Sequence, residues 1–407
     1  MRILMISSTF PYPPSRGGTE VRTFNLLKYL CDRHLVTLAT QRSPDVTDDD
    51  IQGLENFVDT LALFSQPQTL QSSLYRRLNS FNKLGRLATS VAKGTPPNVL
   101  HRYSRELQAW INHQVRIQAF DAITCEHSVN AIYIRPRFQT SLKTVLNAHS
   151  LGYNWTLNHL RMKASDDVLR DRLYLSSSYR YERRFAQQFS TIVVTTPDDQ
   201  QQLAEMCPGM PSQVIPNGVD LDTFRYRTAD LGGHHLVFVG AMDGSHNVDA
   251  MQFFVKDVLP RVRQRYPDTH LSIVGARPTP AALALQEVPG VTVTGKVPSV
   301  VDYLHQATVC VVPLRTGFGI KNKTLEAMAA GVPIVGSDRG LEGLEVDGDG
   351  VPRALRANQI EDYVDAISQL FEQPDLRLQL SQNGRSLVES TYTWERAGER
   401  YEHVLTR

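Results

Sequence analysis

One stretch of the chain combines the residue types that bind a charged ligand rich in hydroxyls. Residues 317–335 read GFGIKNKTLEAMAAGVPIV, a glycine-rich loop expected to run into a helix and then a strand. Lys321 and Lys323 stand at the predicted helix start, where unsatisfied N–H groups and the helix dipole favour an anion such as phosphate. Glu326 follows one turn later, where a carboxylate can accept hydrogen bonds from a cis-diol such as ribose. The spacing therefore predicts a site for a nucleoside diphosphate.

Other interpretations of this stretch stay open. Glu326 and Lys323 are three residues apart on the predicted helix, so an ordinary surface role for Glu326, as a helix cap or as an ion pair with Lys323, is one alternative. The stretch is not G-x-x-x-x-G-K-[ST], and the loop after the first strand is not G-x-G-x-x-G. A P-loop enzyme and a dinucleotide oxidoreductase therefore have little support.

The composition narrows the class of protein. The chain has 407 residues, enough for two domains, and its net charge of +1 gives no reason to expect nucleic acid as a partner. No C-x-x-C motif occurs, so neither a zinc site nor a disulfide framework is indicated, and we expect a reducing, cytoplasmic location. No window approaches 18 apolar residues, so we expect no membrane span.

Short apolar runs alternate with helical patterns along most of the chain, which predicts parallel sheets with right-handed crossovers. This alternation of strand and helix patterns is interrupted at Pro216, Asn217 and Gly218, a strong turn signal, and resumes after them. We therefore expect an α/β protein of two doubly wound, Rossmann-like domains facing across a cleft. The predicted pieces are an N-terminal domain over 1–215, a C-terminal domain over 216–388, and a terminal helix over 389–407 that packs back on the N-terminal domain.

Loops after the predicted strands carry glycine, and ligands of open α/β sheets bind at that edge. For each glycine alone, a tight turn is the better explanation. Several of them on one edge favour a surface shaped for a ligand. They are Gly17 and Gly18 in the first domain, and Gly240, Gly275, Gly295, Gly317 and Gly319 in the second.

Three stretches together resemble a known family: VIPNGVDLDTF, LVFVGAMDGSHNVDAMQFF and GFGIKNKTLEAMAAGVPIV. They resemble the retaining family-4 glycosyltransferases with the GT-B fold, in particular the branch of bacterial exopolysaccharide sugar transferases. The resemblance implies a nucleotide-sugar donor bound mainly by the C-terminal domain and an acceptor bound mainly by the N-terminal domain. It implies a part in polysaccharide biosynthesis.

The resemblance also implies roles for individual residues. Glu326 would hold the ribose, Lys321 and Lys323 the diphosphate, and His149 would lie near the donor sugar, so that His149 and the two lysines form the catalytic set. The alternative for His149 is a buried histidine whose hydrogen bonds are satisfied within the fold and which has no catalytic role. The implied donor-binding positions are Gly18, Gly240, Gly295, Val297, Phe318, Gly319, Ile320 and Glu326.

The sequence departs from the family pattern at two places. Many members carry a glutamate where this chain has Phe318, and many carry an arginine just after the glycine equivalent to Gly240, where Ala241 and Met242 follow here. The first departure puts recognition of the donor sugar in doubt. For the second, the missing charge would come from the two lysines or from His246.

We expect retaining transfer of a glycosyl group to a hydroxyl without a metal and with no cofactor besides the donor substrate, because no D-x-D pair follows a suitable strand. Two alternatives stay open. A nucleotide-sugar epimerase would bind the same donor but needs paired acid–base carboxylates. The second alternative is a catalytically inactive paralogue that binds a nucleotide sugar. The replacement of the family glutamate by Phe318 is the reason to consider it.

The acceptor is expected to be a saccharide or a lipid-linked precursor. Residues 60–105 hold seven Lys or Arg and no Asp or Glu, with apolar residues at helical spacing between them. A basic amphipathic helix over 72–93 would contact an anionic membrane, placing the protein at the inner face of the plasma membrane. The equally weighted alternative is a helix that packs its apolar face on the N-terminal domain.

Overall fold

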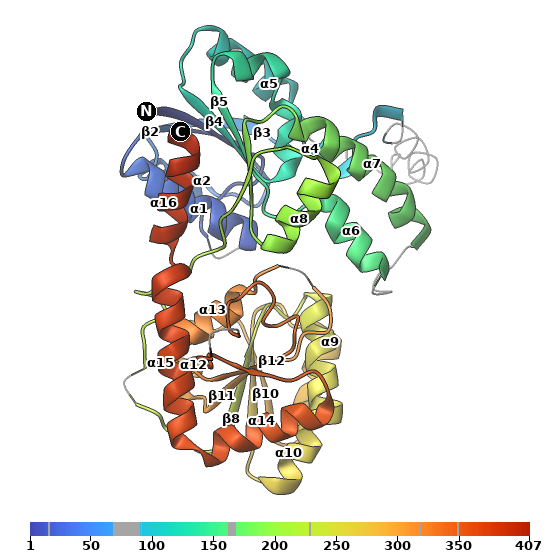
Figure 1. Ribbon diagram of the computed structural model, residues 1–407, viewed down its shortest axis with the longest axis vertical. Coiled ribbons are helices and arrows are strands. Elements are labelled where there is room, and N and C mark those ends of the chain that lie inside the picture. The colour runs from blue at the N-terminus through green and yellow to red at the C-terminus, as the bar shows by residue number, and fades with distance from the viewer. Residues whose placement is uncertain are drawn as a thin grey trace. The chain divides into compact units, whose positions relative to one another are not determined.

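The computed structural model describes residues 1–14, 17–67, 90, 92–161, 168–227, 229–317, 319–347 and 350–407. The chain divides into two compact units (Figure 1). The first contains Met1–Pro216 and Ala397–Arg407, and the second contains Asn217–Arg396. The predicted membrane-contact segment 72–93 lies outside the described residues except for Ser90, Ala92 and Lys93.

The first unit contains a seven-stranded parallel sheet in the order β3-β2-β1-β4-β5-β6-β7. Its direction of strand addition reverses between β1 and β4, which pair in parallel. The strands are β1 Arg2–Ser7, β2 Leu35–Arg42, β3 Thr60–Ser65, β4 Ala122–Glu126, β5 Lys143–Asn147, β6 Thr191–Val194 and β7 Ser212–Val214.

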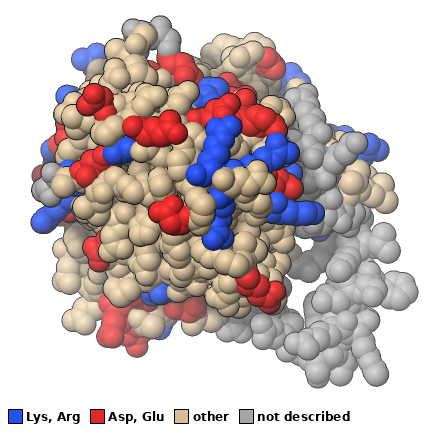
Figure 2. All heavy atoms as spheres, turned by 90° about the horizontal axis from the view of Figure 1, so that it is seen from below, with Lys and Arg blue, Asp and Glu red and all other residues tan. Residues whose placement is uncertain are grey.

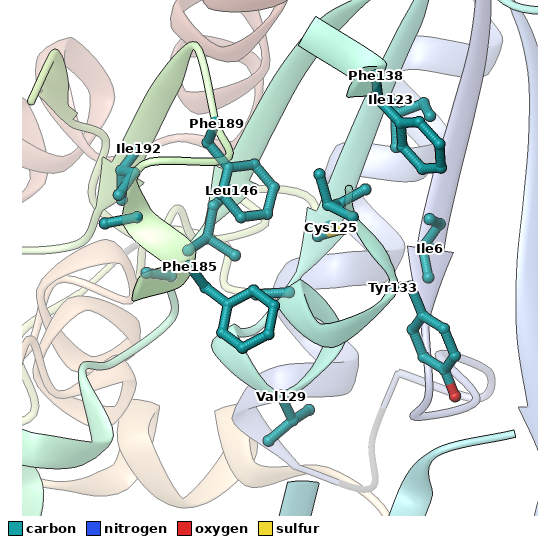
Figure 3. Packing of buried hydrophobic residues seen from close by; sticks show 14 of the residues in the cluster. Ile6, Ile123, Cys125, Val129, Tyr133, Phe138, Leu146, Phe185, Phe189 and Ile192 are labelled. Atoms are coloured by element: carbon teal, nitrogen blue, oxygen red, sulfur yellow. The ribbon is translucent and has the colours of Figure 1, made fainter. Parts of the chain in front are cut away.

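Both faces of this sheet are covered. Alternate residues of a strand point to opposite faces, and Ile3, Leu4, Met5 and Ile6 of β1 are all fully buried. Leu4 and Ile6 belong to one core cluster with residues of α5, α7 and α8, part of which Figure 3 shows. The helical segments are α1 Gly18–Cys31, α2 Asp48–Glu55, α4 Pro97–Arg102, α5 Arg105–Arg116, η1 Ser128–Tyr133, η2 Pro136–Thr140, α6 Gly152–Arg161, α7 Val168–Ala186, α8 Pro197–Met206 and α16 Trp394–Thr406.

The last helix returns to the first unit. The backbone of α16 at Gly398 lies so close to the ring of Tyr29 in α1 that a Cβ atom there would overlap it. Glu402, one turn further, accepts a hydrogen bond from His34 at 2.8 Å. The first unit is therefore completed by the residues at the opposite end of the chain.

The second unit contains a six-stranded parallel sheet in the order β10-β9-β8-β11-β12-β13. This order and that of the first sheet both follow the 3-2-1-4-5-6 pattern of dinucleotide-binding folds. The prediction of two doubly wound α/β domains is therefore confirmed. The strands are β8 His235–Val239, β9 His270–Val274, β10 Val291–Gly295, β11 Val309–Val312, β12 Ile334–Gly336 and β13 Leu355–Arg356.

Two helical layers enclose the second sheet (Figure 1). One core cluster joins it to α9, η3, α10 and α14, and another joins it to α12, α13 and α15. The helical segments are α9 Ser245–Phe253, η3 Phe254–Val258, α10 Leu259–Arg265, α11 Pro280–Leu283, η4 Ala284–Glu287, α12 Val300–Gln306, α13 Asn322–Ala329, α14 Ile360–Glu372 and α15 Pro374–Thr391.

Two local features differ from the sequence prediction. The pattern over 248–266 predicts one α-helix, but the structure inserts a π-helical segment, η3, just before Pro260, which cannot donate a backbone hydrogen bond. No strand is predicted directly before Pro216, but Ser212–Val214 forms the edge strand β7. Three residues are too few for a strand periodicity to be visible.

Charges on the surface are mixed in sign. Figure 2 shows acidic and basic side chains interspersed over the face that it presents. Arg265 of α10 pairs with Asp365 of α14 at 3.1 Å, and Arg261 pairs with Glu361 one turn away. In the part of the chain that the structure describes, no helix is both long and apolar enough to cross a membrane.

Candidate active site

The switch point of the second sheet lies between β8 and β11, where the direction of strand addition reverses. The loop after β8 begins at Gly240, and the loop after β11 leads into α13. In this second loop Gly317 and Gly319 have φ of +101° and +76°, which other residues rarely adopt. The glycine-rich stretch of the sequence therefore lies at the sheet edge where ligands of such folds bind.

Helix α13 begins as the sequence predicts. Leu325 and Met328 are buried in the core of the second unit, and Gly331 follows the helix with φ of +78°. Thr324 Oγ1 donates to the carbonyl of Gly340 at 2.8 Å and anchors the first turn. Lys321, the N-cap residue, makes no side-chain cap hydrogen bond. The positive end of the helix dipole thus stays available to an anion.

The ammonium group of Lys323 is held in place by its neighbours. Its Nζ donates to Asn247 Oδ1 at 2.6 Å and lies 4.2 Å from the ring centroid of Phe238, a cation–π distance. Asn247 is oriented in turn by donating from Nδ2 to Ala241 O at 2.7 Å. A Cβ atom on Gly240 would lie 2.5 Å from Nζ, so the glycine leaves room for the lysine. Burial lowers the pKa of Lys323 to about 7.

Lys321 has a carboxylate partner, which the sequence prediction did not anticipate. Its Nζ lies 3.2 Å from Glu342 Oε2 and donates to the carbonyl of Gly319. Arg339 contacts the other oxygen of Glu342 at 2.9 Å. Burial lowers the pKa of Lys321, and Glu342 opposes that shift. The charge of Lys321 is thus shared with Glu342, whereas Lys323 is held by a neutral amide.

Glu326 is partly buried and accepts no hydrogen bond from any residue that the structure describes. Burial raises the pKa of its carboxyl to about 7, and the nearby charge of Lys323 opposes this rise. Among the described residues no ion pair joins Glu326 and Lys323, and neither side chain is exposed, so the alternative of a surface ion pair is wrong. An unpartnered, desolvated carboxylate has the hydrogen-bonding capacity that a diol would use.

The other expected donor-binding positions differ in their surroundings. Gly295 has φ of +69° at an irregularity of β10, and a Cβ atom there would meet nothing within 4 Å. Val297 and Ile320 are partly buried against the core of the second unit. Phe318 lies outside the described residues. Ala241 and Met242 follow Gly240 where many family members carry an arginine, and Met242 is fully buried.

In the first unit, His149 adjoins a buried polar network. His149 Nε2 is 3.1 Å from Glu126 Oε2, and Glu126 is fully buried. Asn147 Nδ2 donates to the same oxygen at 2.7 Å, while the hydroxyl of Tyr401 donates to Glu126 Oε1 at 2.9 Å. Because Glu126 accepts on both oxygens, His149 carries its proton on Nε2. Its Nδ1 is buried and has no partner among the described residues.

The network reaches two further elements. Arg22 of α1 is 1 % exposed, and its Nε and Nη2 donate to Asn147 Oδ1 at 3.0 and 2.9 Å. Burial lowers the pKa of Arg22 to about 10, and Glu126 opposes that shift. Burial also lowers the pKa of His149, so its imidazole is neutral near pH 7. The neutral ring presents a lone pair at Nδ1.

Sequence reasoning missed Arg22, Glu126, Asn147, Asn247 and Tyr401. Two of them had a visible signal, because Glu126 and Asn147 are polar residues that end buried strands at the ligand edge. The others are brought in by helices, and their spacing in the sequence does not mark them.

Gly18, the expected donor-binding glycine of the first unit, is the first residue of α1. A Cβ atom added to Gly18 would meet no other atom within 4 Å. The packing of the fold therefore does not require glycine at this position, which leaves a ligand as a reason for it.

A pocket of about 630 Å³ opens beside this network and is lined by residues of α4, α6 and α7. His127, whose ring centroid is 5.7 Å from that of His149, lines it. Burial lowers the pKa of His127 to about 3. Glu182 also lines the pocket and accepts from the backbone N–H of Gly152 at 2.6 Å. Among the described residues, no three His, Cys, Asp or Glu side chains gather closely enough to hold a metal ion.

Solved structures with the same fold align over essentially the whole chain. Sucrose-phosphate synthase from Thermosynechococcus elongatus has a TM-score of 0.67 at 17 % identity, covering 99 % of this chain and 98 % of its own. HepE from Anabaena, solved in complex with UDP-glucose, has a TM-score of 0.64 at 14 % identity, covering 100 % and 99 %. TarM from S. aureus, solved as a variant in complex with Fondaparinux, alpha-GlcNAc-glycerol and UDP, has a TM-score of 0.66 at 12 % identity, covering 100 % of both chains.

Comparisons of the sequence itself assign a family. A search among curated proteins finds no significant match. The family model described as glycosyl transferases group 1 matches residues 233–373. The model of glycosyltransferase family 4 matches residues 16–223, just over half of the chain. The fold, the switch-point site and these matches agree, and the chain belongs to glycosyltransferase family 4.

Proposed function

We propose that this glycosyltransferase transfers a glycosyl group from a nucleoside-diphosphate sugar to a hydroxyl acceptor, with retention of configuration and without a metal ion. The observation that carries the proposal is the first turn of α13. There the ammonium of Lys323 lies beside a helix N-terminus that its N-cap side chain leaves uncapped. The carboxylate of Glu326, which has no partner among the described residues, follows one turn later. The complexes of HepE with UDP-glucose and of TarM with UDP support a donor of this class.

The barrier to transfer lies in the departure of the diphosphate from an oxocarbenium-like sugar centre. Negative charge then accumulates on the leaving phosphate, and preorganised donors aimed at that position lower the barrier. In this proposal Lys323 and the N-terminus of α13 supply that stabilisation, with Lys321 as a second cation moderated by Glu342. The positive-φ glycines Gly317 and Gly319 let the backbone approach the ligand. The leaving phosphate takes the proton of the acceptor hydroxyl.

Glu326 and His149 hold hydroxyl groups of the donor in this proposal. The Glu326 carboxylate accepts from the ribose hydroxyls, which provide the hydrogen bonds that the protein leaves unmade. The Nδ1 lone pair of His149 accepts from a hydroxyl of the sugar, because its other nitrogen is committed to Glu126. Gly295 and Val297 flank the base, and Gly18 gives the diphosphate room beside α1.

The acceptor binds to the first unit in this proposal. The pocket of about 630 Å³ beside His127 is large enough for a saccharide or for the sugar of a lipid-linked precursor. A role in polysaccharide biosynthesis at the inner face of the plasma membrane, with contact through 72–93, belongs to the same proposal. Co-sedimentation with anionic vesicles tests the proposed membrane contact. Binding that is absent or does not depend on salt would contradict it.

A donor screen followed by a transfer assay tests the proposal. UDP-, GDP- and ADP-sugars are titrated into the protein, and turnover is then measured with the donor that binds, in the presence of EDTA. Lys323→Met is expected to lower turnover about 10²–10³-fold, the usual cost of removing a donor to a developing oxyanion. Lys256→Met, which removes a lysine of η3 on the outer surface of the second unit, is the control and should leave turnover unchanged.

The outcomes separate this proposal from its rivals. Isomerised donor without transfer would identify an epimerase, and binding heat without turnover would identify a binding protein. Full activity in Lys323→Met would contradict the site assignment, and loss of activity in EDTA that Mg²⁺ restores would contradict metal independence.

A further inference from the structure

A second pocket in the first unit takes no part in the function proposed above. It has a volume of about 450 Å³ and is lined by residues of α6, α7 and α8. Tyr153, Asn154 and Tyr179 line it together with side chains of α8, and Leu157 and Met206 add apolar surface. Its described lining residues include no Lys, Arg or His. The pocket thus combines aromatic rings with many hydrogen-bond acceptors.

The aromatic part of the lining is preassembled. The rings of Tyr153 and Tyr179 meet edge to face, with centroids 5.2 Å apart and planes at 64°. Both side chains are partly buried, and both pack on the core of the first unit. A fixed aromatic wall of this kind packs well against the C–H face of a sugar ring, which is apolar although the ring edge is polar.

Asn154 supplies an observation of a different kind. Its side chain is 4 % exposed, lines the pocket, and has an Nδ2 donor with no partner among the described residues. Buried polar groups are nearly always hydrogen-bonded, so an amide at a pocket wall that is unpaired among the described residues has capacity for a further acceptor. An oxygen atom of a ligand would fill that place.

The polar part of the lining selects the charge of the ligand. Asp198 and Glu205 are seven residues apart, so they lie on one face of α8, with Gln201 and Gln202 between them. Gln201 Nε2 donates to Glu205 Oε1 at 3.2 Å, which leaves the carboxylates with unused acceptor capacity. The position of Asp198 in the first turn is explained by the helix dipole alone, but that effect does not account for Glu205. Two carboxylates, with no cation among the described lining residues, disfavour an anionic ligand.

We propose that this pocket binds an uncharged sugar ring, whose hydroxyls donate to Asp198 and Glu205 while a ring or hydroxyl oxygen accepts from Asn154. A sugar matches the lining because it is rich in donors, carries no charge and has one apolar face. The sugar is a unit of the acceptor remote from the reacting hydroxyl. That last step rests on the proposed function, whereas binding of the sugar itself does not.

Saturation-transfer NMR on the full chain without donor tests the site. The probes are uncharged methyl hexosides, methyl glucuronide and spermidine. The proposal predicts transfer to at least one uncharged hexoside, at least roughly fivefold weaker transfer to the glucuronide, and loss of the hexoside signal in Asn154→Leu and Tyr179→Ala. Leu173→Ala is the control, because Leu173 lies on the same helix, is exposed and lines neither pocket.

The variants also report on folding. Asn154→Leu removes an unpaired buried donor at similar volume, so its melting temperature should not fall. Hexoside binding that survives in Asn154→Leu and Tyr179→Ala, or that is lost in Leu173→Ala instead, would overturn the assignment. Binding of spermidine alone would identify a cation site, and absence of any hexoside signal would also end the proposal. Lys323→Met separates the two proposals, because it should weaken donor binding and lower turnover while it leaves hexoside binding intact.

Discussion

Two titratable groups of opposite charge sit side by side in the proposed donor site, and both titrate near neutrality. Burial lowers the pKa of Lys323 to about 7 and raises the pKa of Glu326 to about 7. A bound diphosphate favours the ammonium form of Lys323 and raises its pKa. Ribose hydroxyls that donate to Glu326 favour the carboxylate form and lower its pKa. Donor binding should therefore be coupled to two proton transfers of opposite sign.

The size and sign of the coupling follow from these values. At pH 8 a group with a pKa of about 7 is about 90 % unprotonated, so Lys323 should take up about 0.9 proton on binding, while Glu326 is already ionised. At pH 6 Glu326 is about 90 % protonated and should release about 0.9 proton, while Lys323 is already charged. The net exchange should pass through zero near pH 7. On either side, affinity should fall towards tenfold per pH unit, or about 1.4 kcal/mol.

Isothermal titration in buffers of different ionisation enthalpy measures this exchange. A nucleotide sugar is the suitable titrant, because its phosphates are diesters without the pKa near 6 that a terminal phosphate would add. Lys323→Met should abolish the uptake at pH 8, and Glu326→Gln should abolish the release at pH 6. An exchange that keeps one sign from pH 6 to 8, or that is unchanged in both variants, would refute the placement of the donor against these two groups.

Three further outcomes are expected. Gly240→Ala places a Cβ atom 2.5 Å from Lys323 Nζ. Donor affinity should therefore fall by about 1–3 kcal/mol, with little change in melting temperature. An unchanged affinity by calorimetry would count against the role of Lys323. Removal of the ribose hydroxyls from the donor should weaken binding to the wild type by about 1.5–3 kcal/mol and have a much smaller effect in Glu326→Gln; equal losses would exclude Glu326 as the ribose acceptor. Tyr401→Phe removes a donor to buried Glu126 and should lower the free energy of unfolding by about 1–3 kcal/mol in urea; a neutral effect would mean that another donor replaces the hydroxyl.

Much of the fold is visible in the sequence because its signals are local. Buried parallel strands appear as short apolar runs, and the start and end of α13 are marked by Lys321 and Gly331. The three-residue strand β7 and the π-helical segment before Pro260 leave no such pattern. They depend on pairing at a sheet edge and on how one proline is accommodated within a continuous helical run.

The candidate site is predicted less completely, because its supporting contacts join distant parts of the chain. Glu126 meets Tyr401 across 275 positions, and Arg22 meets Asn147 across 125. Neither spacing is a local pattern, so the network beside His149 emerges only when the chain folds. The Glu342 partner of Lys321 is a similar case. Sequence alone treats the two lysines as equivalent, whereas the structure gives them different neighbours.

The central claim is that the diphosphate of the donor binds at the first turn of α13. The most direct measurement is a crystal structure of the chain with a nucleotide sugar bound. Phosphate oxygens are expected within hydrogen-bonding distance of Lys323 Nζ, and ribose hydroxyls are expected on the carboxylate of Glu326. A nucleotide bound elsewhere, with Lys323 still on Asn247 and Glu326 still without a partner, would contradict it.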